Sequence, residues 1–138
     1  MLDKSDVATA VSHHLLEEGY SILRKRPAAR NDVDIIARLP ETGAKLFISA
    51  SGVASSKAGR EEMAEIYTES QLFQCISRGI RSALRIHGDY KFISGDQIAL
   101  AFPDTPGFRK YLAAEKPVLD SFGIKVFLVA EEKNVVTL

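Results

Sequence analysis

Three polar side chains, Asp34, Ser49 and Ser51, lie in the stretch NDVDIIARLPETGAKLFISASG between Asn31 and Gly52. Carboxylate oxygens are hard ligands that suit Mg²⁺, but Mg²⁺ gives up its water reluctantly and needs charged partners. One secure carboxylate beside two neutral hydroxyl groups is too little charge for a protein-only Mg²⁺ site. We therefore expect these groups to lie together as a functional site that has lost part of its chemistry, without a bound divalent cation.

Two predicted strands position the three groups. Residues 32–39 and 45–51 each alternate with period 2, and the turn at 40–43 joins them. Paired as a hairpin, the strands would bring Asp34 close to the two serines. The expected faces are Asp32, Asp34 and Ile36 against Val33, Ile35, Ala37 and Leu39, then Lys45, Phe47, Ser49 and Ser51 against Leu46, Ile48 and Ala50.

The other elements follow from helical and strand periodicity. The first two helices have apolar stripes, and the third contains Pro117, which must kink or interrupt it. A polar loop over 52–68, with a helical turn near 61–67, precedes the second helix. The expected helices are Asp3–Glu18, Ser70–His87 (with Thr68 and Gln71 spaced as a capping box) and a helix capped by Thr105 and closed by Gly123. The further strands are Tyr20–Arg26, Gln97–Phe102, Ile124–Ala130 and Val135–Thr137.

The predicted apolar face of the second helix comprises Leu72, Phe73, Ile76, Ile80, Ala83 and Leu84, and that of the third comprises Phe108, Tyr111, Leu112, Leu119 and Phe122. The element order is α-β-β-β-α-β-α-β-β. It predicts an α/β fold in which helices cover both faces of a mixed sheet. With 138 residues the chain suits one domain, 1–138.

Composition narrows the classes of function. Lys plus Arg equals 18 and Asp plus Glu equals 18, whereas general electrostatic binding of nucleic acid usually needs a basic surplus. Any such binding therefore needs a local basic patch. The single Cys75 excludes an internal disulfide framework and suits a reducing cytoplasm. No apolar run resembles a signal peptide or reaches the ~20 residues of a membrane span. We expect a cytoplasmic protein without a membrane partner.

Several of these segments together resemble the PD-(D/E)xK nuclease superfamily, the restriction-endonuclease-like fold. In the similar branch a helix ending LxxxGY precedes strands of the forms VDIIA and IEAKG. Here these segments read LLEEGY at 15–20, VDIIA at 33–37 and ISASG at 48–52, and Ser55-Ser56-Lys57 and Ser70-Gln71 are also similar. The resemblance covers roughly Val7 to Val129 and implies an α-β-β-β-α-β core.

The same resemblance implies a degenerate site. In active members an Asp and a third-strand acidic residue bind Mg²⁺, and a lysine two residues later helps activate water or stabilise the transition state. Asp34 matches the first position, whereas Ser49 stands at the acidic position and Ser51 at the lysine position. The implied protein is catalytically inactive and has no cofactor, with Mg²⁺ as its metal if it is active.

Other residues offer alternatives that stay open. Asp32 or Glu18 could add a metal ligand beside Asp34, although we favour a simple pair of Glu18 with His14 at the end of the first helix. Lys57, with Arg60 nearby, could supply a migrated cation. Nucleic acid could be contacted by Gln71 at the start of the second helix and by the arginines on its outer face, Arg78, Arg81 and Arg85.

Three functions follow from these alternatives. The first is an inactive PD-(D/E)xK module that binds nucleic acid or regulates another process. The second is an active metal-dependent nuclease with a displaced lysine. The third is a protein-interaction or dimerisation scaffold, and the sequence leaves the partner and the oligomeric state open.

Overall fold

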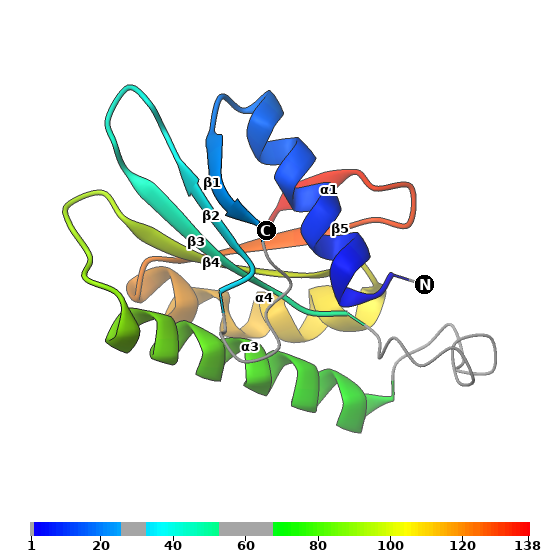
Figure 1. Ribbon diagram of the computed structural model, residues 1–138. Helices are drawn as coiled ribbons and strands as arrows, with labels where there is room; N and C mark the ends of the chain where they lie inside the picture. Colours follow the sequence, from blue (N-terminus) through cyan, green and yellow to red (C-terminus); the bar gives the residue numbers. More distant parts are fainter. Residues whose placement is uncertain (1, 26–32, 53–67) are drawn as a thin grey trace.

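The computed structural model describes residues 2–25, 33–52 and 68–138, and these form an α/β fold (Figure 1). The predicted element order is confirmed over these residues. The loop and helical turn expected within 53–67, together with Asp32, Lys57 and Arg60, lie outside the described residues. The elements are α1 (Lys4–Glu17), β1 (Ser21–Lys25), β2 (Ile35–Arg38), β3 (Lys45–Ala50), α3 (Glu69–Asp89), β4 (Gln97–Pro103), α4 (Pro106–Ser121), β5 (Ile124–Val129) and β6 (Val135–Thr137).

The strands form one six-stranded mixed sheet in the order β1-β2-β3-β4-β5-β6. β1, β2 and β3 are antiparallel neighbours, so the predicted hairpin is confirmed. β3, β4 and β5 run parallel, and β6 returns antiparallel at the far edge. β2 runs antiparallel to β3. The start of β2 therefore lies beside the carboxyl ends of β3, β4 and β5, and we call this end of the strands the carboxyl edge.

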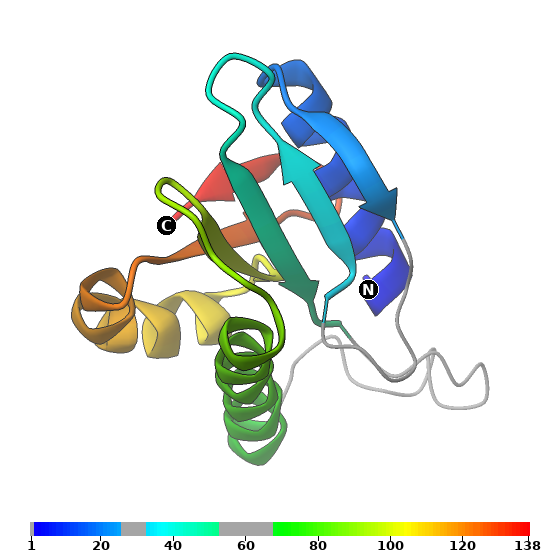
Figure 2. The same cartoon turned by 60° about the vertical axis from the view of Figure 1, so that its left-hand side comes forward.

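Helices cover both faces of this sheet. α1 packs on one face and α3 and α4 pack on the other (Figures 1 and 2). Each face has its own core, and the α1 core is built around Val7, Val11, Ile35 and Ile48. The core beneath α3 and α4 includes Phe47, Leu72, Ile76, Ile98, Leu100, Phe102, Phe108, Leu112 and Leu128. None of the described helices is long and apolar enough to span a bilayer.

The helix starts agree with the sequence analysis. Asp3 caps α1 through a capping box with Asp6, and Thr68 caps α3 through the predicted box with Gln71. Thr105 caps α4, whose first residue is Pro106. The predicted interruption at Pro117 does not occur, because α4 continues through Pro117 to Ser121. All three capped ends lie toward the carboxyl edge, because each of these helices packs against strands whose orientation fixes its direction.

Three predicted core contacts are wrong. Phe73 and Leu84 of α3 are 74% and 67% exposed, and Phe122 after α4 is 74% exposed. An α-helix turns about 100° per residue, so Phe73 is rotated away from its buried neighbour Leu72. The buried stripe of α3 consists instead of Leu72, Ile76, Gly79, Ala83 and Ile86.

The predicted alternation before β2 is also wrong at Val33 and Asp34. Val33 packs in the core beneath α3 and α4, whereas Ile35 packs in the α1 core, so the two do not share a face. The chain bends at Asp34, and regular strand geometry begins only at Ile35. This bend also redirects the Asp34 side chain.

Candidate functional site

Asp34 lies at the carboxyl edge, in the bend that leads into β2. Its residue is 1% exposed. The Asp34 backbone N–H donates to the Ile48 carbonyl at 2.8 Å, which continues the ladder between β2 and β3. One carboxylate oxygen accepts from the Ala50 backbone N–H at 2.8 Å. The carboxylate is therefore bound into the backbone of the neighbouring strand.

Lys4, the first residue of α1, supplies the charge partner. Its Nζ lies 3.1 Å from the other Asp34 carboxylate oxygen, and the lysine side chain is 41% exposed while that of Asp34 is fully covered. This contact depends on a close approach between the backbone at Gly52 and the start of α1. A Cβ added to Gly52, just after β3, would lie 2.6 Å from the Lys4 nitrogen, so only glycine lets the start of α1 sit there.

The two serines belong to the opposite face of the sheet. Leu46, Ile48 and Ala50 pack in the α1 core, so their alternating neighbour Ser49 faces the α3 side, where it is 5% exposed beside Leu100 of β4. Ser51 forms a hydrogen bond with the Cys75 thiol of α3. Burial raises the pKa of Cys75, and the hydrogen bond from Ser51 offsets part of that increase.

The site is thus split by the sheet. The register pairs Ile35 with Ile48, so Asp34 lies across from Ser49 along the backbone. Yet the bend directs the Asp34 carboxylate to Lys4 and the Ala50 N–H, both on the side of α1, while Ser49 and Ser51 point to α3. The structure brings these three residues to one edge and gives their side chains separate partners.

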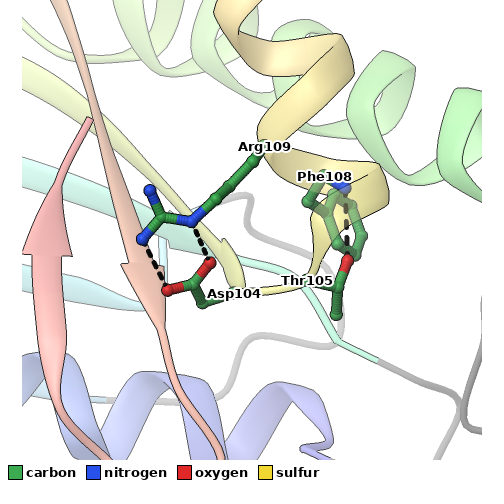
Figure 3. Close-up of polar contacts among 4 residues, drawn as sticks. All are labelled: Asp104, Thr105, Phe108 and Arg109. Carbon is green, nitrogen blue, oxygen red and sulfur yellow. Dashed lines mark hydrogen bonds and ion pairs between the residues drawn. The ribbon is translucent and has the colours of Figure 1, made fainter.

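The rest of the carboxyl edge is also built from paired charges. Asp104, which follows β4, accepts two hydrogen bonds from Arg109, at 2.6 Å from Nε and 2.8 Å from the second nitrogen (Figure 3). This bidentate pair raises the pKa of Arg109 above its usual value, chiefly through the hydrogen bond to Asp104. Lys133 lies 3.6 Å from Asp6 of α1. Over the described residues, the cations named here at this edge each have a carboxylate partner.

The remaining candidates have contacts of their own or are exposed to solvent. Glu18 is 61% exposed at the far end of α1 and lies 3.7 Å from His14, which is the simple pair favoured by the sequence. Fourteen helical residues span about 21 Å, so Glu18 does not reach the Lys4 end. The Gln71 side chain accepts from the Thr68 N–H and thereby caps α3. Arg78, Arg81 and Arg85 are exposed on α3, as predicted.

Sequence reasoning missed Lys4. The Asp3 cap places Lys4 in the first turn of α1, but its contact with Asp34 depends on how α1 packs beside Gly52. Within ranges 2–25, 33–52 and 68–138 no group of three or more His, Cys, Asp or Glu side chains is arranged to hold a metal ion. The charges named at the described edge form ion pairs.

Comparison with known proteins adds only a distant likeness. No protein-family model matches the sequence, and no curated protein matches it. A similar solved structure is that of SfsA from Pyrococcus furiosus in complex with Ca²⁺, with 14% identity and a TM-score of 0.40. The match covers 94% of this chain and 58% of that chain, so this chain spans well under two thirds of the SfsA length. A likeness this distant says nothing about what the present chain binds or does.

Proposed function

We propose that the chain is a single, catalytically inactive PD-(D/E)xK nuclease-like domain that serves as a nucleic-acid-binding module. The observation that carries the proposal is the ion pair between Asp34 and Lys4, whose charged atoms lie 3.1 Å apart. The same Asp34 carboxylate also accepts a hydrogen bond from the Ala50 N–H. A metal-binding carboxylate must offer an oxygen to the cation. Here the lysine ammonium compensates the charge that a divalent cation would compensate.

The chain also lacks the groups that would act beside the metal. Ser49 and Ser51 replace the acid and the lysine of the resembled motif, and both face away from the Asp34 carboxylate. Losing one group that stabilises transition-state charge commonly costs ~100–1000-fold in rate. Two such losses, together with a compensated aspartate, favour an inactive protein.

The nucleic-acid part of the proposal is supported by local positive charge on a chain whose formal net charge is zero. Arg78, Arg81 and Arg85 recur at spacings of three and four on α3 and are exposed. Guanidinium groups in such a row suit successive backbone phosphates. Phosphate contacts of this kind position a nucleic acid without reading its sequence.

Calorimetric titration with Mg²⁺ and Mn²⁺, followed by a cleavage assay on DNA and RNA, tests the proposal. We expect no heat of metal binding and no cleavage, while labelled oligonucleotides bind at low salt. Asp34→Ala is the control variant, because a true catalytic aspartate would abolish cleavage when replaced. Cleavage by the unmodified protein that Asp34→Ala removes would overturn the inactive assignment and direct attention to Lys57.

A second candidate, an interaction or dimerisation scaffold, is favoured by four exposed apolar side chains on the α3 and α4 layer. These are Phe73, Leu84, Val118 and Phe122, with exposed fractions of 74%, 67%, 59% and 74%. Exposed apolar side chains of this size can serve as protein contacts, and all four belong to one helical layer. Sedimentation velocity over a range of concentrations distinguishes the two, since a scaffold would self-associate and Phe73→Ser with Phe122→Ser would prevent it.

A further inference from the structure

The half of the sheet formed by β1, β2 and the start of β3 has a face that the described helices leave open. α3 packs against β3 and β4, and α4 packs against β5, on the side opposite α1. In Figure 2 strands β1, β2 and β3 face the viewer, with α1 behind them and α3 below. Burial agrees at β2, since Ile36 on this face is only half-buried whereas Ile35 on the α1 face is 0% exposed, while Phe47 on β3 is already covered at 3% exposed.

The strand register places basic side chains on this face. Arg24 of β1 is opposite Ile36, and Ile36 is opposite Phe47, so these three form one row across the strands. Arg38 is opposite Lys45 and forms the next row, two residues along on the same face. Two positive charges directly opposite each other repel, so this pairing does not serve the stability of the sheet.

Aromatic rings continue from the first row. Phe47 lies 4.9 Å from Phe92 in a stacked arrangement and 5.0 Å from Tyr90. His87, exposed at the end of α3, lies 5.1 Å from Phe92, and Arg24 donates to the Tyr90 hydroxyl at 3.2 Å. The rings therefore form one cluster, in which Phe47 and Phe92 are stacked and the exposed His87 imidazole lies at its end.

Asp96 is an acidic residue beside this surface, and its carboxylate accepts two backbone N–H groups. Its two carboxylate oxygens accept from the Lys45 N–H at 2.9 Å and from the Ile93 N–H at 3.0 Å. The Lys45 ammonium and the Arg24 and Arg38 guanidinium groups outnumber the single Asp96 carboxylate, and with the His87 ring they make a positive, ring-bearing surface. We call this set, with Tyr90 and Phe92, the open sheet face.

We propose that the open sheet face binds single-stranded nucleic acid, its cations contacting backbone phosphates and its ring cluster accepting an unpaired base. Proteins that bind single strands without sequence preference combine a positive surface with aromatic platforms, because every base has a face that stacks. A duplex keeps its bases stacked on one another and offers only phosphates to such a surface. An acidic protein segment would use the cations and leave the rings unused.

The inference rests on the proposed nucleic-acid binding and names where and what this chain binds. The test measures fluorescence anisotropy with labelled oligo-dT, oligo-rU and a mixed-sequence duplex, using the full chain across a salt series. We expect both single strands to bind at least about 5-fold more tightly than the duplex. In Arg38→Gln with Lys45→Gln we expect at least 10-fold weaker binding and a salt-dependence slope smaller by about 1.4, the value for two phosphate contacts on a single strand.

Matched variants keep the result specific. Lys110→Gln with Lys116→Gln on α4 removes the same charge elsewhere and should leave affinity and slope near those of the wild type. His87→Ala removes the exposed ring and should weaken single-strand binding about 10-fold, within the range of one lost base–ring stack. Circular dichroism of each variant confirms that it is folded.

Each contrary outcome has a distinct meaning. Unchanged binding in the Arg38 and Lys45 variant, with binding lost in Arg78→Gln, Arg81→Gln and Arg85→Gln, would overturn the open sheet face and leave the proposed function standing. Equal or tighter binding of the duplex, or effective competition by polyglutamate, would overturn the single-strand assignment. Failure of the wild type to bind any oligonucleotide would refute the nucleic-acid function itself.

Discussion

At the scale of single residues, Asp34 and Lys4 are coupled by burial. The aspartate is inside the fold and the lysine is partly in water, at 0% and 41% exposure of their side chains. Removing only the lysine leaves a buried negative charge with less compensation, which is the costly way to break such a pair. Removing both charges together avoids that penalty.

We therefore predict a positive coupling between Lys4→Met and Asp34→Asn. The asparagine keeps an oxygen that can accept a hydrogen bond from the Ala50 N–H. The double-mutant cycle therefore measures the interaction between the two charges. Lys4→Met alone should lower the free energy of unfolding by about 2 kcal/mol, and the double variant should recover about 1 kcal/mol of the summed losses. Urea denaturation with an unchanged m value measures this, and strictly additive losses would contradict the pairing.

Cys75 gives a second prediction, on pH. Burial raises its pKa from the ordinary 9.0, and the Ser51 hydrogen bond lowers it, so Ser51→Ala should raise the pKa further. Because the folded pKa exceeds the unfolded one, the stabilisation is complete below about pH 9 and is lost as the pH rises through the folded value. Thiolate absorbance during a pH titration checks both shifts, with urea-unfolded protein as the reference. A midpoint at or below that of the unfolded protein would contradict them.

These residues show which features of the site could be predicted from the sequence. It correctly placed Asp34 beside β3, because a period-2 pattern on both sides of a turn specifies a hairpin. It could not give the direction of the Asp34 carboxylate, which depends on a bend that ends the alternation. It could not give Lys4 either, because that contact depends on how α1 packs beside Gly52.

At the scale of elements, α3 shows the same limit. Its start, its end and most of its buried stripe follow from a capping box and a helical period. The exposure of Phe73 and Leu84 could not be predicted in this way. The apolar face of the helix is wide, and the sequence does not show which part of it the sheet covers. The glycines of α3 depend on the same packing.

We predict opposite effects of alanine at Gly79 and Gly88, two glycines of one helix. A Cβ at Gly79 would lie 2.8 Å from the buried ring of Phe102, whereas one at Gly88 meets nothing within 4 Å. Gly79→Ala should destabilise by about 1–3 kcal/mol through overpacking, despite a better helix propensity. Gly88→Ala should be neutral or stabilise by up to about 1 kcal/mol. Thermal unfolding of both variants measures the contrast, and a shared sign would refute it.

At the scale of the whole molecule, the mixed sheet was predictable but its strand order was not. Helices between strands indicate parallel crossovers, and the hairpin indicates an antiparallel pair, yet neither pattern says which edge β4 joins. In the observed order each strand neighbours the next along the chain, and each face of the resulting sheet carries one core. The α1 core and the core beneath α3 and α4 share β2, β3, β4 and β5 as a common wall.

This shared wall leads us to predict one cooperative unfolding transition. Unfolding either core would expose one face of strands whose other face belongs to the second core, so neither half should unfold alone. Ile48→Val in the α1 core and Ile86→Val beneath α3 remove the same methylene from residues that are 0% and 1% exposed. Each should lower the free energy of unfolding by about 0.5–1.5 kcal/mol and shift the whole transition. Tyrosine fluorescence and far-ultraviolet circular dichroism should report the same midpoint in urea for both variants. A transition that splits in one variant and stays single in the other would mean that the two cores unfold independently.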